Sequence, residues 1–289
     1  MPVEMIIKET ANCPKADEPI LTDAGFYWRE RAGVKVLVCA PLERAGFANG
    51  FSTRVGGVSP FPANDLNLAG YDEDSAENIA ENRRRFLATF EGEYKLATVW
   101  QIHSDRIKHV AGEDDIEMSD EKFDALVSNL EDVMLGVKTA DCVPVLIGDP
   151  ATGAFAAVHA GWRGTAESVV AKTVAKMRTT FGTDPRDLLC AIGPAATCRS
   201  YEIGQDVIDV FRDNFDDGDK YLSATRDGHA MIDLHAANRA QLVSCGVDKI
   251  FTAPVCTMER TDLFFSYRVE KKLYGRTGRL MSVIGKRQR

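Results

Sequence analysis

The feature that most limits how this chain can fold is its mixture of strand-length and helix-length segments, which do not alternate regularly. Short apolar runs typical of strands lie at residues 33–40, 97–104, 132–149, 153–160, 187–194, 249–254 and 279–286. Helical spacing of apolar residues is found at 75–90, 166–181, 204–215 and 234–245. A doubly wound protein would need a strict strand–helix–strand order. The pattern therefore predicts an α+β fold with mixed sheets.

Length and composition predict one main domain. The 289 residues are enough for one large domain, and no repeat, low-complexity tract or linker divides them. Residues 1–25 mix charges with three prolines and show no clear periodicity, so we expect an N-terminal arm there. Residues 26–289 are expected to form the single catalytic domain.

Charge and hydropathy exclude several classes of protein. The net charge of −8 argues against binding to nucleic acid, which requires a basic face. No apolar run is long enough to span a membrane, and residues 1–25 have no signal-peptide core. Seven cysteines without a CxxC motif fit neither a disulfide framework nor a zinc ribbon. These observations predict a cytoplasmic protein that binds neither nucleic acid nor membrane.

Three of the predicted strands contain residues that could act together chemically. His103 is at the end of one apolar strand, Cys142 is expected inside another, and His159 is near the end of a third. One thiolate and two imidazoles leave the fourth position of a zinc ion open, as in catalytic zinc sites. The same residue types also fit a Cys–His hydrolase or a blue-copper site. Because the three are far apart in the sequence, spacing alone also allows an inert core role for each.

A glycine-rich loop holds a candidate anion ligand. In the segment FSTRVGG, Arg54 stands beside Gly56 and Gly57. An arginine fork can bind phosphate or carboxylate in two places, and glycines permit close approach. The alternative is a solvated arginine in a turn. No P-loop or GxGxxG motif is present, so a nucleotide cofactor is not expected.

Several ordered motifs resemble the laccase-domain family, whose members have been described as multicopper polyphenol oxidases and as purine nucleoside phosphorylases. From about residue 46 to 286 the matching segments are FSTRVGGVS, DLNLAG, WQIHSD, TADCVPVLIGDP, AAVHAGWRGT, IGPAATCRSYEIG, DLHAANRAQL, FFSYR and GRTGRLMSVIGK. The resemblance implies a layered α/β/β/α fold. It also implies phosphorolysis of adenosine, inosine and 5′-methylthioadenosine, together with deamination of adenosine.

The resemblance further implies a set of site residues. It makes His103, Cys142 and His159 the ligands of one zinc ion, with roles in catalysis. It puts Arg54 near a phosphate site. The residues at motif positions expected to line the substrate pocket are Asn67, Gln101 and Tyr201. The substrates implied are purine nucleosides and phosphate, while the oligomeric state is left open.

The number of histidines limits the metal chemistry. A four-copper laccase needs many histidine ligands, and this chain has five histidines in total. One mononuclear metal is therefore expected, zinc rather than copper. The alternatives that remain are a copper-dependent polyphenol oxidase and a Cys–His hydrolase.

Deamination would also need a carboxylate that moves protons. Asp141 is adjacent to Cys142, but neighbouring residues of a strand point to opposite faces. We therefore do not expect Asp141 in the pocket of Cys142, and Glu202 is the other candidate.

Overall fold

Two six-stranded sheets form the centre of the molecule in a computed structural model that describes residues 18–60, 65–69, 74–117 and 120–287. The first sheet has the order β1 (Phe26–Arg31), β2 (Val34–Cys39), β3 (Phe47–Ser52), β15 (Leu280–Lys286), β7 (Val133–Thr139), β4 (Lys95–Ala97). The second has the order β14 (Lys249–Thr252), β10 (Leu189–Ile192), β8 (Val143–Gly148), β9 (Phe155–Ala160), β6 (Ala125–Ser128), β5 (Ile107–His109). Both are mixed sheets: β4 pairs with β7, β10 with β14 and β5 with β6 in parallel, while the other pairs are antiparallel.

The remaining elements surround these sheets. A small third sheet has the order β11 (Glu202–Gly204), β13 (His229–Ile232), β12 (Leu222–Arg226). The helices are α2 (Glu18–Asp23), α3 (Ala40–Arg44), α4 (Ala76–Leu87), α5 (Glu113–Glu117), α6 (Trp162–Ala166), α7 (Val169–Phe181), α8 (Gln205–Asn214), α9 (Leu234–Ser244) and α10 (Tyr267–Tyr274). Two short 3₁₀ turns span Pro185–Asp187 and Gly218–Tyr221.

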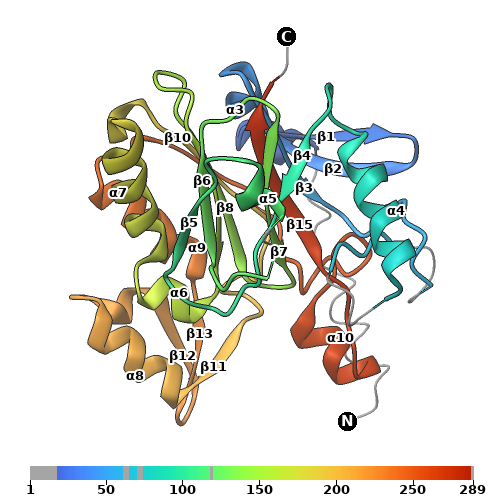
Figure 1. Cartoon of the computed structure of the whole chain (residues 1–289). Helices are drawn as coiled ribbons and strands as arrows, with labels where there is room; N and C mark the ends of the chain where they lie inside the picture. Colours follow the sequence, from blue (N-terminus) through green and yellow to red (C-terminus); the bar gives the residue numbers. More distant parts are fainter. Residues whose placement is uncertain (1–17, 61–64, 70–73, 118–119, 288–289) are drawn as a thin grey trace.

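The hydrophobic core lies in three layers. Between the two large sheets, Phe51 of the first packs in one cluster with Leu146 and Phe155 of the second. On the outer face of the first sheet, α4 contributes Phe86. On the outer face of the second sheet, α7 contributes Val170. Figure 1 shows α4 and α7 on opposite sides of the paired sheets.

This layering confirms the predicted α+β fold and its α/β/β/α arrangement. The predicted helix at 75–90 forms α4, and the Ser75 hydroxyl caps it by accepting a hydrogen bond from the Asn78 N–H at 3.2 Å. The division of the chain at residue 25 stays a prediction. Residues 1–17 of the expected arm lie outside the described residues, and α2 covers 18–23.

The apolar run at 132–149, which the sequence allows to be one strand or two broken near Pro144, is two strands with the break at 140–142. Strand β7 ends at Thr139 in the first sheet, and β8 begins at Val143 in the second. Between them Asp141 has a φ of 85°, a left-handed conformation that ends extended structure. Pro144 lies inside β8 instead. Cys142 is therefore in a bend before β8 and not inside a strand, which corrects the prediction.

The predicted strand at 97–104 is also corrected, because β4 ends at Ala97. The chain after it is irregular and reaches a second left-handed residue at His103, with a φ of 61°. The polar end of this segment is held by hydrogen bonds from its backbone N–H groups to the side chain of Asp124 rather than by a sheet.

Candidate active site

His103, Cys142 and His159 come together in space. Their ligand atoms all lie within 4.8 Å of one another. The Cys142 Sγ is 3.8 Å from His103 Nε2, and the two imidazole ring centroids are 4.9 Å apart. The structure thus brings together the three residues that the sequence singled out, from positions that the sequence alone could not relate.

Each residue of this triad is positioned by a different part of the chain. His103 lies on the irregular segment after β4, and Cys142 lies in the bend that carries the chain from the first sheet to the second. His159 is buried on β9, where it pairs with Pro144 of β8. Cys142 is partly exposed and His103 is exposed, so the triad opens to solvent on one side.

A fourth residue, Asp124, holds two members of the triad, and the sequence analysis missed it. Asp124 is fully buried just before β6. Its Oδ1 accepts hydrogen bonds from His159 Nδ1 at 2.8 Å and from the His103 backbone N–H at 2.9 Å. Its Oδ2 accepts from the backbone N–H of Ser104 at 2.6 Å and from the Ser104 hydroxyl at 2.7 Å. The only signal in the sequence is an acidic residue directly before the short apolar run ALVS.

The charges of this group suit a cation. Desolvation raises the pKa of Cys142, but His159 and His103 outweigh it and bring that pKa down to about 6. Desolvation lowers the pKa of His159, but Cys142 and Asp124 together raise that pKa to about 9. For Asp124, burial is outweighed mainly by His159 and Ser104, and its pKa falls to about 2. Without a metal, the site thus contains a thiolate, a carboxylate and a protonated His159 at neutral pH, and a metal ion would take the place of the proton on His159 Nε2.

This donor set fits a metal ion. The bond from His159 Nδ1 to Asp124 leaves Nε2 of that ring as the ligand atom, the carboxylate–histidine arrangement that metal sites use. One thiolate and two imidazoles supply three ligands and leave one position open. Zinc and copper both accept such ligands, so the residues do not choose between them.

The side chain of Asp141 does not contact the same residues as the side chain of Cys142. Its carboxylate accepts hydrogen bonds from the Thr257 hydroxyl at 2.7 Å, the Ser266 hydroxyl at 3.0 Å and the Arg268 backbone N–H at 2.7 Å. The expected separation of Asp141 and Cys142 is thus observed, but strand alternation is not the reason. The left-handed turn at Asp141 aims its side chain away. Glu202, the other predicted proton carrier, bonds instead to Arg226 and Thr225.

Tyr201 is close to the triad. Burial first, and the negative charge of Cys142 second, raise the pKa of its phenol to about 12. The guanidinium carbon of Arg268 lies 4.9 Å from the centroid of the Tyr201 ring. Tyr201 therefore stays protonated at neutral pH, with an O–H group available to donate.

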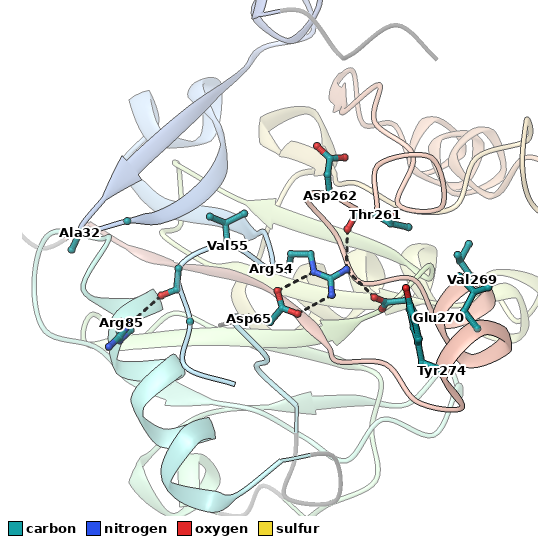
Figure 2. A pocket seen from close by; sticks show the side chains of 14 residues that line it. Ala32, Arg54, Val55, Asp65, Arg85, Thr261, Asp262, Val269, Glu270 and Tyr274 are labelled. Carbon is teal, nitrogen blue, oxygen red and sulfur yellow. Dashed lines mark hydrogen bonds and ion pairs between the residues drawn. The ribbon is translucent and has the colours of Figure 1, made fainter. Parts of the chain in front are cut away.

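Arg54 is enclosed by carboxylates (Figure 2). It donates to both oxygens of Asp65 at 3.1 and 2.8 Å, to Glu270 at 2.8 Å and to the Thr261 carbonyl at 2.8 Å. These residues line a cavity of about 860 Å³ beside α10. The predicted contact of Arg54 with phosphate stays a prediction.

Asn67 and Gln101 bond to the backbone in this structure. The Asn67 side-chain oxygen accepts from the N–H groups of Ala69 at 3.1 Å and Arg279 at 2.9 Å. The Gln101 amide donates to the Lys138 carbonyl at 2.6 Å and accepts from its N–H at 2.7 Å. Their predicted contacts with substrate stay predictions.

Fold and site together define a layered α+β protein with a His–Cys–His group suited to one metal ion. The chain belongs to the family described as multi-copper polyphenol oxidoreductase laccase, whose model matches residues 48–287. It is 34% identical over 260 residues to the purine nucleoside phosphorylase YfiH of Escherichia coli, covering 86% of this chain and 98% of that protein. It is 36% identical over 250 residues to a purine nucleoside phosphorylase of Deinococcus radiodurans, covering 85% and 92%.

Solved structures share the fold. The Bacillus licheniformis hypothetical protein YfiH superposes with a TM-score of 0.82 at 29% identity, over 90% of this chain and 99% of that one. YlmD from Geobacillus stearothermophilus gives a TM-score of 0.81 at 30% identity, over 91% and 99%. Within the residues described here, no helix combines the length and the apolar character needed to cross a membrane.

Proposed function

We propose that this protein is a zinc-dependent purine nucleoside phosphorylase that acts on inosine, adenosine and 5′-methylthioadenosine. The observation that carries the proposal is the convergence of His103, Cys142 and His159, with Asp124 behind them. It is joined by identity of about one third to proteins named purine nucleoside phosphorylase. His103, Cys142 and His159 would hold the zinc ion.

Phosphorolysis places clear demands on the residues around the triad. A phosphate oxygen bonds to C1′ of the ribose while the bond from C1′ to the purine breaks, and negative charge develops on the departing base. When bound, zinc supplies Lewis-acid chemistry that stabilises negative charge on a ligand atom. Asp124 keeps His159 in one tautomer and orientation. The protonated phenol of Tyr201 can donate a hydrogen bond to the leaving base.

Deamination of adenosine would need a free carboxylate to move protons. Asp141, Glu202 and Asp124 all accept hydrogen bonds from other protein groups. Phosphorolysis is therefore the activity we propose first. Ammonia release from adenosine is the measurement that would add deamination to it.

The residues argue for one metal ion rather than several. Among the parts of the chain that the structure describes, the triad is the one group of three or more His, Cys, Asp or Glu residues arranged to hold a metal. A four-copper oxidase needs further histidine clusters. A single copper ion in the triad would still make a polyphenol oxidase, so the metal must be identified directly.

The test combines metal analysis with an inosine assay. Untagged protein should contain about one zinc per chain and release hypoxanthine from inosine only when phosphate is present. Cys142→Ala should abolish release, while Cys245→Ser, at the end of α9, should not. Release without phosphate would indicate a hydrolase. A blue, copper-containing protein without hypoxanthine release would indicate an oxidase.

A further inference from the structure

The arginines that could receive an anion differ in how their charge is balanced. Arg54 is paired with both Asp65 and Glu270, so this buried group has an excess of negative charge. An incoming phosphate would have to displace these carboxylates or share the guanidinium with them. The structure therefore gives a reason to look for the phosphate ligand elsewhere.

Arg268, at the start of α10, is exposed and differently bonded. One guanidinium N–H donates to the Glu202 carbonyl at 2.7 Å, and the group also bonds the phenol of Tyr201. Within the described part of the chain, its guanidinium forms no ion pair with a carboxylate. The nearby carboxylate of Asp141 binds the backbone N–H of Arg268 instead, and that of Glu202 is bonded by Arg226. With five N–H groups, the guanidinium keeps donors for a ligand.

Two contacts place Arg268 beside the triad. The Arg268 guanidinium carbon lies 4.9 Å from the centroid of the Tyr201 ring, and the charge of Cys142 acts on the phenol of the same tyrosine. Asp141, which fixes the backbone of Arg268 at 2.7 Å, directly precedes Cys142 in the chain. The guanidinium is thus held against Tyr201, and its backbone is fixed by the residue that precedes Cys142.

We propose that Arg268, rather than Arg54, binds the phosphate that attacks the nucleoside; the proposal rests on the proposed phosphorylase function. The fork of the guanidinium binds two phosphate oxygens and leaves another free to attack. That oxygen forms the bond to C1′ as the C1′–N9 bond breaks, and the electron pair leaves with the purine. The proton of hydrogen phosphate ends on a nitrogen of the free base, so that the products are ribose 1-phosphate and the purine.

A second exposed arginine provides a comparison. Arg163 lies four residues after His159, and its guanidinium carbon is 4.2 Å from the ring centroid of Trp162. Arg212, on α8, pairs with Asp219 on the surface and serves as the distant control.

The experiment measures the KM for phosphate and the KM for inosine in wild type, Arg268→Gln, Arg268→Lys, Arg163→Gln and Arg212→Gln. Loss of a charge-assisted contact should raise the KM for phosphate by about 10- to 100-fold in Arg268→Gln. The KM for inosine should change less than about twofold by the same reasoning, since only the anion loses a partner. The KM for phosphate of Arg268→Lys should lie between those of wild type and Arg268→Gln. Arg212→Gln should have the same KM for phosphate as wild type.

Other outcomes overturn the proposal. An unchanged KM for phosphate in Arg268→Gln, or a rise confined to Arg163→Gln, places the phosphate elsewhere. If Arg268→Gln fails to fold by circular dichroism, Arg268→Lys decides, because a KM for phosphate equal to wild type in that variant rejects a bidentate fork. Titration of inorganic phosphate by calorimetry separates the hypothesis of an anion site at Arg268 from the proposed phosphorylase function. Binding that depends on Arg268 without turnover keeps the anion site and removes phosphorolysis, and no binding removes the anion site.

Discussion

At the scale of single residues, Asp124 does more for the site than its position in the sequence suggests. Its two oxygens accept five hydrogen bonds, from Ile102, His103, Ser104 and His159. One carboxylate thus orients the imidazole of His159 and fixes the backbone of His103. Because Asp124 is fully buried, these bonds form away from water, where each is stronger.

Removing the Asp124 carboxylate should weaken metal binding more than folding. We expect Asp124→Ala to lower the affinity for zinc by about 10- to 100-fold, the usual effect of losing a residue that orients a ligand histidine. Competition with a chromophoric chelator measures this. Asp149→Asn is the matched control, since Asp149 is another buried carboxylate that holds the turn after β8. Equal zinc affinity in wild type and Asp124→Ala would contradict the role given to Asp124.

The residue scale also shows what the sequence could predict. The motifs and the family resemblance identified His103, Cys142 and His159, and the structure brings them together. Asp124 was missed because its role depends on a partner 35 residues away, and nothing local distinguishes it from a surface acid. Arg54 illustrates the opposite case, since its glycine-rich loop gave no sign of the two carboxylates that enclose it.

At the scale of elements, the bend at 140–142 determines where the thiol lies. It carries the chain from β7 in the first sheet to β8 in the second. Its central residue, Asp141, holds a left-handed conformation and receives three hydrogen bonds on its carboxylate. Asp and Asn tolerate that conformation better than most residues with a side chain.

Substitutions at Asp141 should separate the contribution of its left-handed backbone to stability from the contribution of its carboxylate. Asp141→Asn should cost least, since Asn also adopts left-handed backbone. Asp141→Ala should be less stable than Asp141→Gly by about 1 kcal/mol, because only glycine enters this conformation freely. Urea denaturation measures the free energy of unfolding. Ser168, left-handed with a φ of 62° and without a side-chain cap bond, is the control.

The same pair of substitutions at Ser168 shows which variant should be the more stable at a left-handed residue. Ser168→Gly should exceed Ser168→Ala in stability by a similar amount of about 1 kcal/mol. If Asp141→Ala is at least as stable as Asp141→Gly while the Ser168 pair behaves as stated, the left-handed bend is not what positions Cys142.

Apolar patterns predicted where strands and helices lie better than they predicted which strands belong to the same sheet. The continuous run at 132–149 contains no signal that its two halves belong to different sheets, because both halves are buried. The predicted strand at 97–104 failed for a different reason: beyond Ala97 the segment makes only an isolated bridge, from Trp100 to Lys122, and Trp100 and Ile102 are exposed. In contrast, α4 was predictable, because helical spacing and a serine cap are local signals.

At the scale of the whole molecule, the order of the strands depends on contacts between distant parts of the chain. Strand β15, near the end of the chain, lies between β3 and β7. No periodicity predicts such an insertion. The α+β class followed from the mixture of elements, whereas the α/β/β/α layering was available only through the family resemblance.

The same layering places the triad where the two sheets are connected. His103 lies on the connection from β4 to β5 and Cys142 on the connection from β7 to β8, and each connection joins the two sheets. His159 belongs to β9 of the second sheet. A metal held by all three would therefore cross-link the two halves of the fold in the native state only.

Removal of the metal should consequently lower the thermal stability of the whole protein. A metal that binds only the folded state stabilises it by about 2.7 kcal/mol when its free concentration is 100 times its dissociation constant. We expect the melting temperature of chelator-stripped wild type to lie several degrees below that of zinc-loaded protein. Calorimetry of Cys142→Ala should show no such difference, whereas Cys245→Ser should retain it. Identical melting temperatures for stripped and loaded wild type would mean that the triad does not join the two sheets through a metal.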